Sequence, residues 1–227
     1  MARWTFLAWA MLPVTTLAGC VDAPPSAPRR PVRMVSRPVV QPIPPSAQTR
    51  ACMIGLRREN IGYAPVPDQY YGAGCSTLGS VRLSYLRSDR SELALANAGP
   101  VTCQLATTLQ GWARFGVDRA AQAILGSPLV KIETMGSYNC RNVAGTARKS
   151  AHATANAIDV SGFLLADGRR VTVLRDWRDA DPQTRAFLRT VRDSACKRFG
   201  TVLSPDYNAA HRDHLHLEVG PARPLCA

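Results

Sequence analysis

The chain has 227 residues, and its 28 lysines and arginines outnumber its 16 aspartates and glutamates, so the formal net charge at pH 7 is +12. Such a basic protein favours an anionic partner, which could be nucleic acid, phospholipid or a carboxylate-rich cell-wall polymer. The sequence has no helix-turn-helix, no zinc-finger spacing and no aromatic RNA-binding signature, so we expect no nucleic acid among its partners.

The N-terminus is typical of an export signal. A basic start at Arg3 precedes an apolar run from Phe6 to Val14, which is too short to span a membrane, and then Leu17-Ala18-Gly19-Cys20. These four residues resemble the lipobox of bacterial lipoproteins, in which the cysteine is acylated. We therefore predict a signal peptide over residues 1–19 and a membrane anchor through lipid on Cys20. An ordinary signal peptide with an incidental cysteine is the alternative.

Residues 20–49 are rich in proline, alanine, serine and arginine, and such a segment buries little apolar surface. We expect an extended tether there, followed by one domain over residues 50–227, which is long enough to bury a substantial core. Val21, in place of an aspartate after the lipobox cysteine, favours the outer membrane. The expected location is therefore the periplasm, with the lipid anchor in the outer membrane.

Six cysteines remain after Cys20, and an even number in an exported chain predicts three disulfides in an oxidising compartment. Six cysteines allow fifteen connectivities, and the sequence does not choose among them. No Cys-x-x-Cys occurs, so a zinc–thiolate cluster is not expected. The disulfide candidates are Cys52, Cys75, Cys103, Cys140, Cys196 and Cys226.

The first half of the domain has weak periodicity. Residues 52–90 are rich in glycine, tyrosine and serine, so we expect loops and short strands. Pro100 is expected to start a helix that ends at Gly116, and residues 118–125 are expected to form a second, short helix closed by Gly126. The apolar stripe of the first helix is predicted from Leu105, Leu109, Trp112 and Phe115.

The second half gives clearer signals of strands and of one capped helix. Asp181-Pro182 is typical of a helix start, and an apolar stripe runs from Leu188 to Phe199 before Gly200. Strands are predicted for residues 129–134, 159–163, 170–173 and 201–203. Together these elements predict an α+β fold with a small central antiparallel sheet flanked by helices.

Three of the four histidines of the chain lie within six residues, at positions 211, 214 and 216. Leucine and valine alternate with His214, His216 and Glu218, so the two histidines face one side of a predicted strand. The fourth histidine, His152, stands seven residues before Asp159 in a segment of small side chains. Two imidazoles and a carboxylate suit a catalytic Zn²⁺ with an open fourth position. We therefore predict metal ligands at His152, Asp159 and His216.

These motifs resemble a known group of enzymes. Ser-x-His-x6-Asp with a distant His-x-His is similar to the zinc D-Ala-D-Ala carboxypeptidases and the penicillin-insensitive murein endopeptidases, and the spacing from His211 to His216 is most similar to the endopeptidases. Residues 140–163, 200–203 and 207–211 resemble the bacterial extensin-like C-terminal domain, a related group, and this likeness covers about residues 50–226. Ala155 replaces the usual glycine of the carboxypeptidases, and Asp213 replaces a frequent glutamate.

The resemblance implies roles for several neighbours of the ligands. Asp213 has the position of the general base in the carboxypeptidases, whereas His214, with His211 as a second member, has the endopeptidase spacing; we favour His214. Arg141 is implied to hold a substrate carboxylate or an oxyanion, and one more surface arginine is the alternative. Ser150 either binds substrate or caps the ligand loop.

The resemblance implies a zinc metallopeptidase that hydrolyses peptide bonds in the stem peptides of peptidoglycan, with crosslink cleavage favoured over removal of a terminal D-alanine. Whether the bond is a D,D- or an L,D-bond stays open. A lipoprotein that binds peptidoglycan without cutting it is the main alternative. A lysozyme-like or phosphoesterase protein is a weaker one, because the sequence lacks a carboxylate-rich two-metal cluster.

Overall fold

The computed structural model describes residues 43–220 and 225–227. The predicted signal peptide, the predicted lipidation site Cys20 and most of the predicted tether lie outside the described residues. Within the described part of the chain, no helix is both long enough and apolar enough to cross a membrane.

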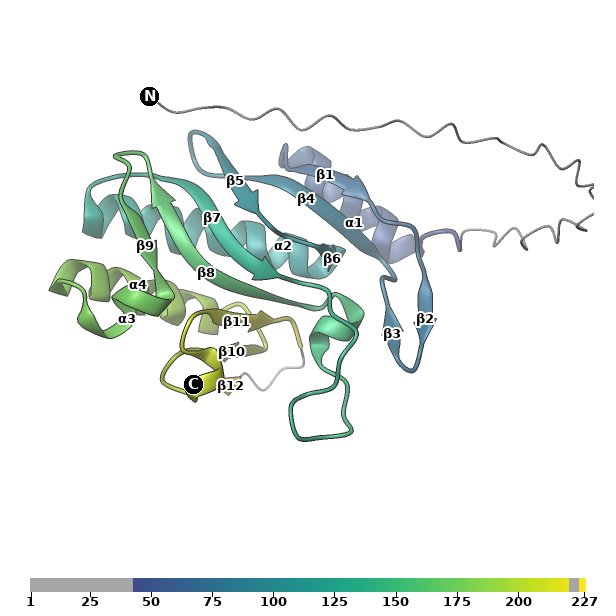
Figure 1. The fold of residues 1–227 in the computed structure, drawn as a ribbon. Coiled ribbons are helices and arrows are strands. Elements are labelled where there is room, and N and C mark those ends of the chain that lie inside the picture. Colours follow the sequence, from purple (N-terminus) through teal and green to yellow (C-terminus); the bar gives the residue numbers. More distant parts are fainter. Residues whose placement is uncertain (1–42, 221–224) are drawn as a thin grey trace, which may run out of the picture. The chain divides into compact units, whose positions relative to one another are not determined.

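A mixed sheet of ten strands forms the centre of the domain (Figure 1). Its strands are Gly62–Pro65 (β1), Ser80–Arg87 (β4), Glu92–Ala96 (β5), Pro100–Thr102 (β6), Leu129–Gly136 (β7), Ala157–Leu165 (β8), Arg170–Thr172 (β9), Thr201–Leu203 (β10), Leu215–Glu218 (β11) and Leu225–Cys226 (β12). The order is β1-β4-β5-β7-β8-β11-β10-β12, with β6 beside β4 and β9 beside β8. Only β5–β7 and β10–β12 are parallel pairs among the described strands.

The predicted α+β class agrees with this architecture, but the expected small sheet is wrong. Its additional strands are β12 and the four strands within residues 62–102, a segment that begins in the stretch 52–90 where we expected loops and short strands. The longest of these, β4, pairs with three other strands, and alternate residues such as Val81 and Leu83 are buried. A separate hairpin of β2 (Tyr70–Gly72) and β3 (Cys75–Ser76) extends from this region.

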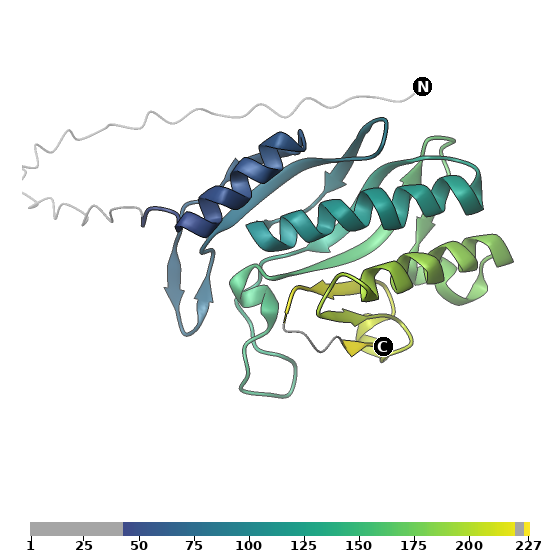
Figure 2. The ribbon, with the colours of Figure 1, turned by 180° about the vertical axis from the view of Figure 1, so that it is seen from behind.

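Helices cover one face of the sheet, as Figures 1 and 2 show from opposite sides. They are α1 (Ala47–Arg58), α2 (Cys103–Trp112), and α4 (Pro182–Cys196), while the short α3 (Val173–Asp179) packs beside β9 and α4. Helix α2 continues through two π-helical segments, η1 (Ala113–Asp118) and η2 (Ala121–Leu125). The core lies between this helical layer and the sheet.

Aromatic side chains fill the centre of that core. Trp112 lies 6.2 Å from Phe163 of β8 and 6.1 Å from Phe199, measured between ring centroids. Phe163 in turn meets Phe187 of α4 edge-on at 5.4 Å. The indole N–H of Trp112 donates to the carbonyl of Val191, so this buried polar group is satisfied.

Two expectations about the first long helix are wrong. Pro100 lies in β6, and the helix starts at Cys103 after Thr102, whose hydroxyl accepts from the N–H of Leu105. The helix also passes through Gly116, because glycine there allows a close approach to α4: a Cβ would lie 2.2 Å from Ser194 Oγ. The real end is Gly126, which has a φ of 69°.

Phe115 was predicted to be in the core stripe, but its side chain is 45% exposed. The π-helical turns change the angle between successive residues, so a stripe extrapolated at 3.6 residues per turn points to the wrong face. The guanidinium of Arg119 lies 4.6 Å from the centroid of the Phe115 ring.

Helix α1 lies where the sequence predicted a tether and a loop. Ser46 caps it by accepting from the N–H of Thr49. Leu56 is its only fully buried residue, and for this reason the sequence shows no apolar periodicity that would indicate a helix here. The predicted start of the Asp181-capped helix α4 is correct, and its predicted stripe, from Leu188 to Phe199, is buried.

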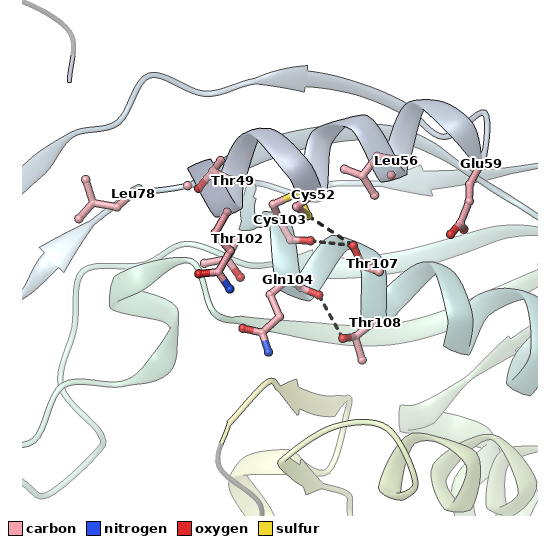
Figure 3. A pocket seen from close by; sticks show the side chains of 13 residues that line it. Thr49, Cys52, Leu56, Glu59, Leu78, Thr102, Cys103, Gln104, Thr107 and Thr108 are labelled. Atoms are coloured by element: carbon pink, nitrogen blue, oxygen red, sulfur yellow. Dashed lines mark hydrogen bonds between the residues drawn. A yellow bond between two sulfur atoms is a disulfide. The ribbon is translucent and has the colours of Figure 1, made fainter. Parts of the chain in front are cut away.

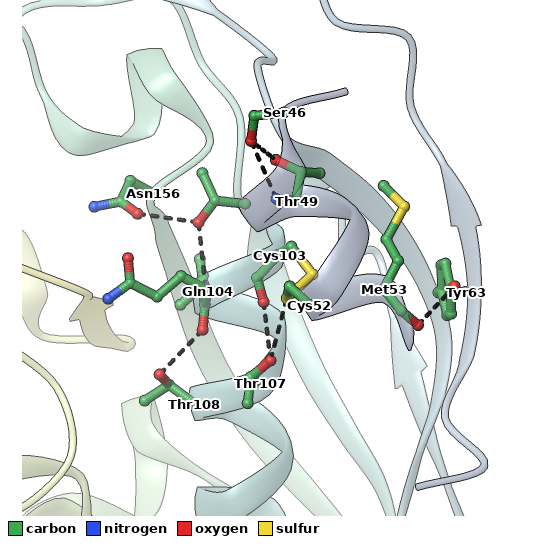
Figure 4. Close-up of a disulfide and its surroundings, with 12 residues drawn as sticks. Ser46, Thr49, Cys52, Met53, Tyr63, Cys103, Gln104, Thr107, Thr108 and Asn156 are labelled. Atoms are coloured by element: carbon green, nitrogen blue, oxygen red, sulfur yellow. Dashed lines mark hydrogen bonds between the residues drawn. A yellow bond between two sulfur atoms is a disulfide. The ribbon is translucent and has the colours of Figure 1, made fainter. Parts of the chain in front are cut away.

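The six domain cysteines form three disulfides, Cys52–Cys103, Cys75–Cys140 and Cys196–Cys226. The first joins α1 to α2 (Figure 4), beside a cavity of about 500 Å³ between the two helices (Figure 3). The second joins β3 to the loop after β7, and the third joins α4 to β12. Three disulfides indicate an extracellular or periplasmic, oxidising location.

Candidate metal centre

A one-turn helix positions the first predicted ligand. Residues Ala151–Thr154 form η3, and Ser150 caps it by accepting from the N–H of His152 with its Oγ. The turn ends at Ala155, whose φ of 56° reverses the chain into β8. The alanines at 153, 155 and 157 are fully buried, so this tight path requires the small side chains seen in the sequence.

The pairing of β8 with β11 brings the other two ligands together. His216 lies directly opposite Asp159 in this antiparallel pair. Leu215 and Leu217 are fully buried in the core on the helical side, so by alternation His216 faces the other side of the sheet. The strand pairing therefore places an imidazole and a carboxylate together from residues 57 positions apart.

The three predicted ligands converge. His152 Nε2 lies 3.2 Å from His216 Nδ1 and 3.2 Å from Asp159 Oδ2. His216 Nδ1 lies 3.0 Å from Asp159 Oδ1. Ligands placed about 2.0–2.1 Å from a tetrahedral zinc are separated by about 3.3 Å, so these spacings fit such an ion. Among the described residues, this is the group of three or more histidine, cysteine or acidic side chains that could hold a metal.

Outer partners select the ring nitrogens that face the centre. The carbonyl oxygen of Ser137 lies 2.6 Å from His152 Nδ1, and a carbonyl only accepts, so Nδ1 donates. This leaves the Nε2 lone pair for a metal in the neutral ring. In His216, Nε2 lies 3.5 Å from Glu218 Oε2, and Nδ1 faces the centre. Carbonyl and carboxylate partners of this kind orient metal-binding histidines.

Electrostatics favour the charged forms of Asp159 and His216. Burial raises the pKa of Asp159, but hydrogen bonds with His152 and His216 outweigh it and hold that pKa well below its usual range. Burial lowers the pKa of His216, whereas Asp159 and Glu218 raise it, to about 9 in total. The carboxylate therefore supplies a fixed negative charge at the place where a cation would bind.

Two further histidines lie beside the three ligands. His214 Nε2 is 3.6 Å from Asp159 Oδ1, while its Nδ1 is 2.8 Å from Asp213 Oδ1. The strand begins after both residues, at Leu215, so Asp213 can hydrogen-bond to the imidazole of His214. The carboxylate of Asp159 then remains in contact with His152 and His216. The arrangement is an aspartate–histidine pair next to the candidate metal centre.

His211 belongs to the short helix η4 (Ala209–His211), and its Nδ1 lies 2.7 Å from Oδ1 of Asn208. Its ring centroid is 5.2 Å from that of His214 and 6.0 Å from that of His216. Burial, then the nearby charges of His214 and His216, lowers the pKa of His211 to about 4. The ring is therefore neutral at pH 7.

The other two predicted site residues lie at the edge. Ser150 is buried and caps η3. Of the two roles that the sequence left open, substrate binding and capping of the ligand loop, the structure shows the capping role. Arg141 lies on an exposed loop, where the only hydrogen bond of its side chain among the described residues runs to the carbonyl of Asn142. Its charge contributes to the lowered pKa of His211, so it lies near the centre without touching a ligand.

Sequence reasoning missed several residues that hold the centre together. Glu218 carried a signal, because it alternates with His214 and His216 on the same strand face. Ser137 acts through its backbone carbonyl, which has no side-chain signature. Asn156 accepts from the hydroxyl of Thr102 and donates to the carbonyl of Val219, and so fixes the segment between two ligands.

Comparisons with known proteins identify the family but give no characterised relative. The model of the family described as extensin-like protein C-terminus matches residues 50–226. No curated protein matches the chain, and no solved structure matches it either. The match covers every strand of the sheet, and it includes every residue of the candidate metal centre.

Proposed function

The chain belongs to the extensin-like C-terminal family, and from this premise and its His-Asp-His centre we propose that it is a zinc-dependent hydrolase of peptide bonds in peptidoglycan stem peptides. The observation that carries the proposal is the convergence of His152, Asp159 and His216 within bonding reach of one ion. Cleavage of a crosslink is our preferred reaction, and removal of a terminal residue is the alternative.

The donor set supports zinc as the ion. Two imidazole nitrogens and one carboxylate oxygen suit Zn²⁺, and three protein ligands are typical of catalytic sites, which keep one position open. An ion bound there would polarise the scissile carbonyl and make water acidic enough to attack near neutral pH.

The Asp213–His214 pair supports a general acid–base role. The carboxylate of Asp213 accepts from Nδ1–H of His214 and so leaves its Nε2 free on the side of the ligands. An imidazole at that point can take a proton from the attacking water and return it to the leaving amine. We therefore assign the proton transfer to His214 and its orientation to Asp213.

His211 and Arg141 are assigned to the substrate. A neutral His211 imidazole with Nδ1 held by Asn208 presents its other nitrogen to a peptide group or an oxyanion. Arg141, whose charge acts on His211, is assigned to a carboxylate of the stem peptide. His211 lies in η4, shortly before β11, and Arg141 lies in the loop between β7 and η3.

The proposed location is the periplasm, with lipid on Cys20 as the anchor. The three disulfides support an oxidising compartment, and the net charge of +12 suits the anionic wall polymer. Incubating the cells with a labelled fatty acid tests the anchor: label in the wild-type chain and none in Cys20→Ser is the expected result.

The catalytic proposal is tested by mass spectrometry of purified crosslinked muropeptides incubated with the zinc-loaded protein. We expect monomers to appear and a chelator to prevent this. His152→Ala and Asp159→Asn should each reduce the rate by more than the roughly 10–100-fold typical of outer partners of a metal site. Asp193→Asn, an exposed aspartate on α4, is the control and should keep full activity.

Full activity in His152→Ala or Asp159→Asn would refute the assigned ligands. If all forms bind crosslinked peptidoglycan and none cleaves it, the protein is a binding lipoprotein, and the metal supports structure only.

A further inference from the structure

Two exposed arms project from one end of the sheet, next to the candidate metal centre (Figures 1 and 2). The first is the hairpin of β2 and β3, and the second is the loop of residues 141–149. Neither arm contributes a residue to the hydrophobic core other than through the buried disulfide sulfur of Cys75. We call them the hairpin arm and the loop arm.

Covalent and hydrogen bonds fix both arms to the segment of His152. The Cys75–Cys140 disulfide ties the hairpin arm to the base of the loop arm. The N–H of Asn139 donates to the carbonyl of His152, and the N–H of Ser150 donates to the carbonyl of Arg141. β3 also packs beside η3. The arms therefore keep a defined place relative to the ligands.

The loop arm is itself ordered. Asn142 and Lys149 form an antiparallel bridge, and the N–H of Val143 donates to the carbonyl of Arg148. Side-chain methylenes of Lys149 lie against Gly74 at the tip of the hairpin arm, where an added Cβ would be 3.3 Å from Lys149 Cγ. The two arms thus meet side by side and form one continuous surface.

The hairpin arm presents aromatic rings to solvent. Tyr70 is 61% exposed and Tyr71 is 49% exposed. The Tyr71 ring lies 5.7 Å from that of Tyr138, which directly follows the residue whose carbonyl holds His152. Large aromatic side chains left exposed on a small hairpin are candidates for a binding surface, since burial elsewhere would be favourable.

The loop arm presents cations without counterions. Several arginines of the sheet and helices pair with a carboxylate, such as Arg119 with Asp89 and Arg170 with Glu133. In the described part of the chain, no carboxylate lies within ion-pair distance of Arg141, Arg148 or Lys149. Three unpaired cations beside exposed rings favour a ligand that carries both ring faces and carboxylates.

We propose that the two arms bind a peptidoglycan strand next to the bond to be cut, with sugar rings on Tyr70 and Tyr71 and stem-peptide carboxylates on Arg148 and Lys149. This inference rests on the proposed function for the identity of the polymer. A glycan strand with acidic peptides supplies both chemistries at once, and an extended polymer can follow the surface from the arms to the metal centre.

The test is cosedimentation of the purified full chain with insoluble peptidoglycan in the presence of chelator, so that binding is measured without hydrolysis. Tyr70→Ala/Tyr71→Ala and Arg148→Glu/Lys149→Glu should each weaken binding roughly tenfold. Phe115→Ala, an exposed ring on η1, and Arg57→Glu/Arg58→Glu, exposed cations on α1, are matched controls and should bind as the wild type does.

A conservative variant separates a loss of binding from a loss of folding. Tyr70 Oη accepts from the N–H of Gly74 within the hairpin arm, so the alanine variant removes this hydrogen bond together with the ring. Tyr70→Phe/Tyr71→Phe keeps the rings and should stay within about twofold of the wild type. Binding to glycan strands that have been stripped of their peptides should depend on the tyrosines only. The cation variant should also lose most of the salt dependence of binding.

Wild-type binding by both the alanine and the glutamate variants would overturn the proposal. If the same variants lost binding to anionic phospholipid vesicles to an equal extent, the proposal would also be overturned, because the surface would then recognise a membrane. Absence of hydrolysis in the wild type leaves this test intact, since a binding-only protein would still depend on the arms. Failure of the arms and failure of the catalytic proposal are therefore distinguishable.

Discussion

Glu218 illustrates how single side chains tune the candidate metal centre. Its carboxylate lies 3.5 Å from Nε2 of His216, on the side away from Asp159. A carboxylate there holds the ring orientation and makes the opposite nitrogen a better donor to a cation. Ser137 does the same for His152 through a backbone carbonyl, which no substitution of its side chain removes.

We predict that Glu218→Gln lowers zinc affinity by about 10–100-fold, the usual effect of removing an outer partner of a metal-binding histidine. Competition with a chromophoric chelator measures this directly. Glu59→Gln, an exposed residue after α1, is the matched control and should bind zinc normally. Equal affinities of Glu218→Gln and the wild type would mean that the carboxylate does not support the ligand.

At the scale of elements, the η3–β8 connection determines whether the ligands can meet. Ala155 adopts a φ of 56° and is fully buried, a conformation that costs L-residues about 1–2 kcal/mol. Glycine at this point would avoid that cost. The buried methyl group of Ala155 compensates for part of it, because the side chain packs in the interior.

We predict that Ala155→Val destabilises the protein by roughly 2 kcal/mol or more, because a β-branched residue is strained at positive φ and overpacks the site. Ala155→Gly should change stability by less than about 1 kcal/mol, since relief of strain offsets the lost methyl group and the greater freedom of the unfolded chain. Urea denaturation gives both values.

Ala153→Val is the control for overpacking alone, because Ala153 is equally buried but lies in a right-handed turn. If Ala155→Val lowered the free energy of unfolding by no more than Ala153→Val does, the positive φ of Ala155 would carry no penalty.

For the whole molecule, the disulfides and an ion at the candidate centre would stabilise different parts of the fold. The three disulfides close loops of 30 to 65 residues and tie α1, the hairpin arm and β12 to the body of the domain. Each such crosslink contributes about 2–4 kcal/mol. An ion at the candidate centre would instead join β8 to β11 and η3, which the disulfides do not link.

We predict that zinc at a hundred times its dissociation constant stabilises the protein by about 2.7 kcal/mol, because the unfolded chain lacks the assembled site. For a domain of this size, the midpoint of thermal unfolding should rise by about 5–10 °C. Differential scanning calorimetry with and without chelator tests this. Asp159→Asn should show no such shift, and a shift of equal size in that variant would place the ion elsewhere.

The sequence by itself was sufficient to predict that His152, Asp159 and His216 lie together, because small residues around His152 and the alternation around His216 are local patterns with few interpretations. It was also sufficient for α4, where a cap and an apolar stripe coincide. The sequence did not reveal α1, since one buried residue makes no periodic signal. It also did not reveal that the helix continues in π-helical form past Gly116, because the glycine there serves the close approach to α4 and does not end the helix.

Only the tertiary structure decided how distant segments combine. The cysteine pairs, the carbonyl of Ser137 behind His152 and the meeting of the two arms all join residues whose separation along the chain says nothing of their distance in space. Strand pairing between β8 and β11 likewise brings Asp159 and His216 together, because register across a sheet depends on the whole packed core and on no local pattern.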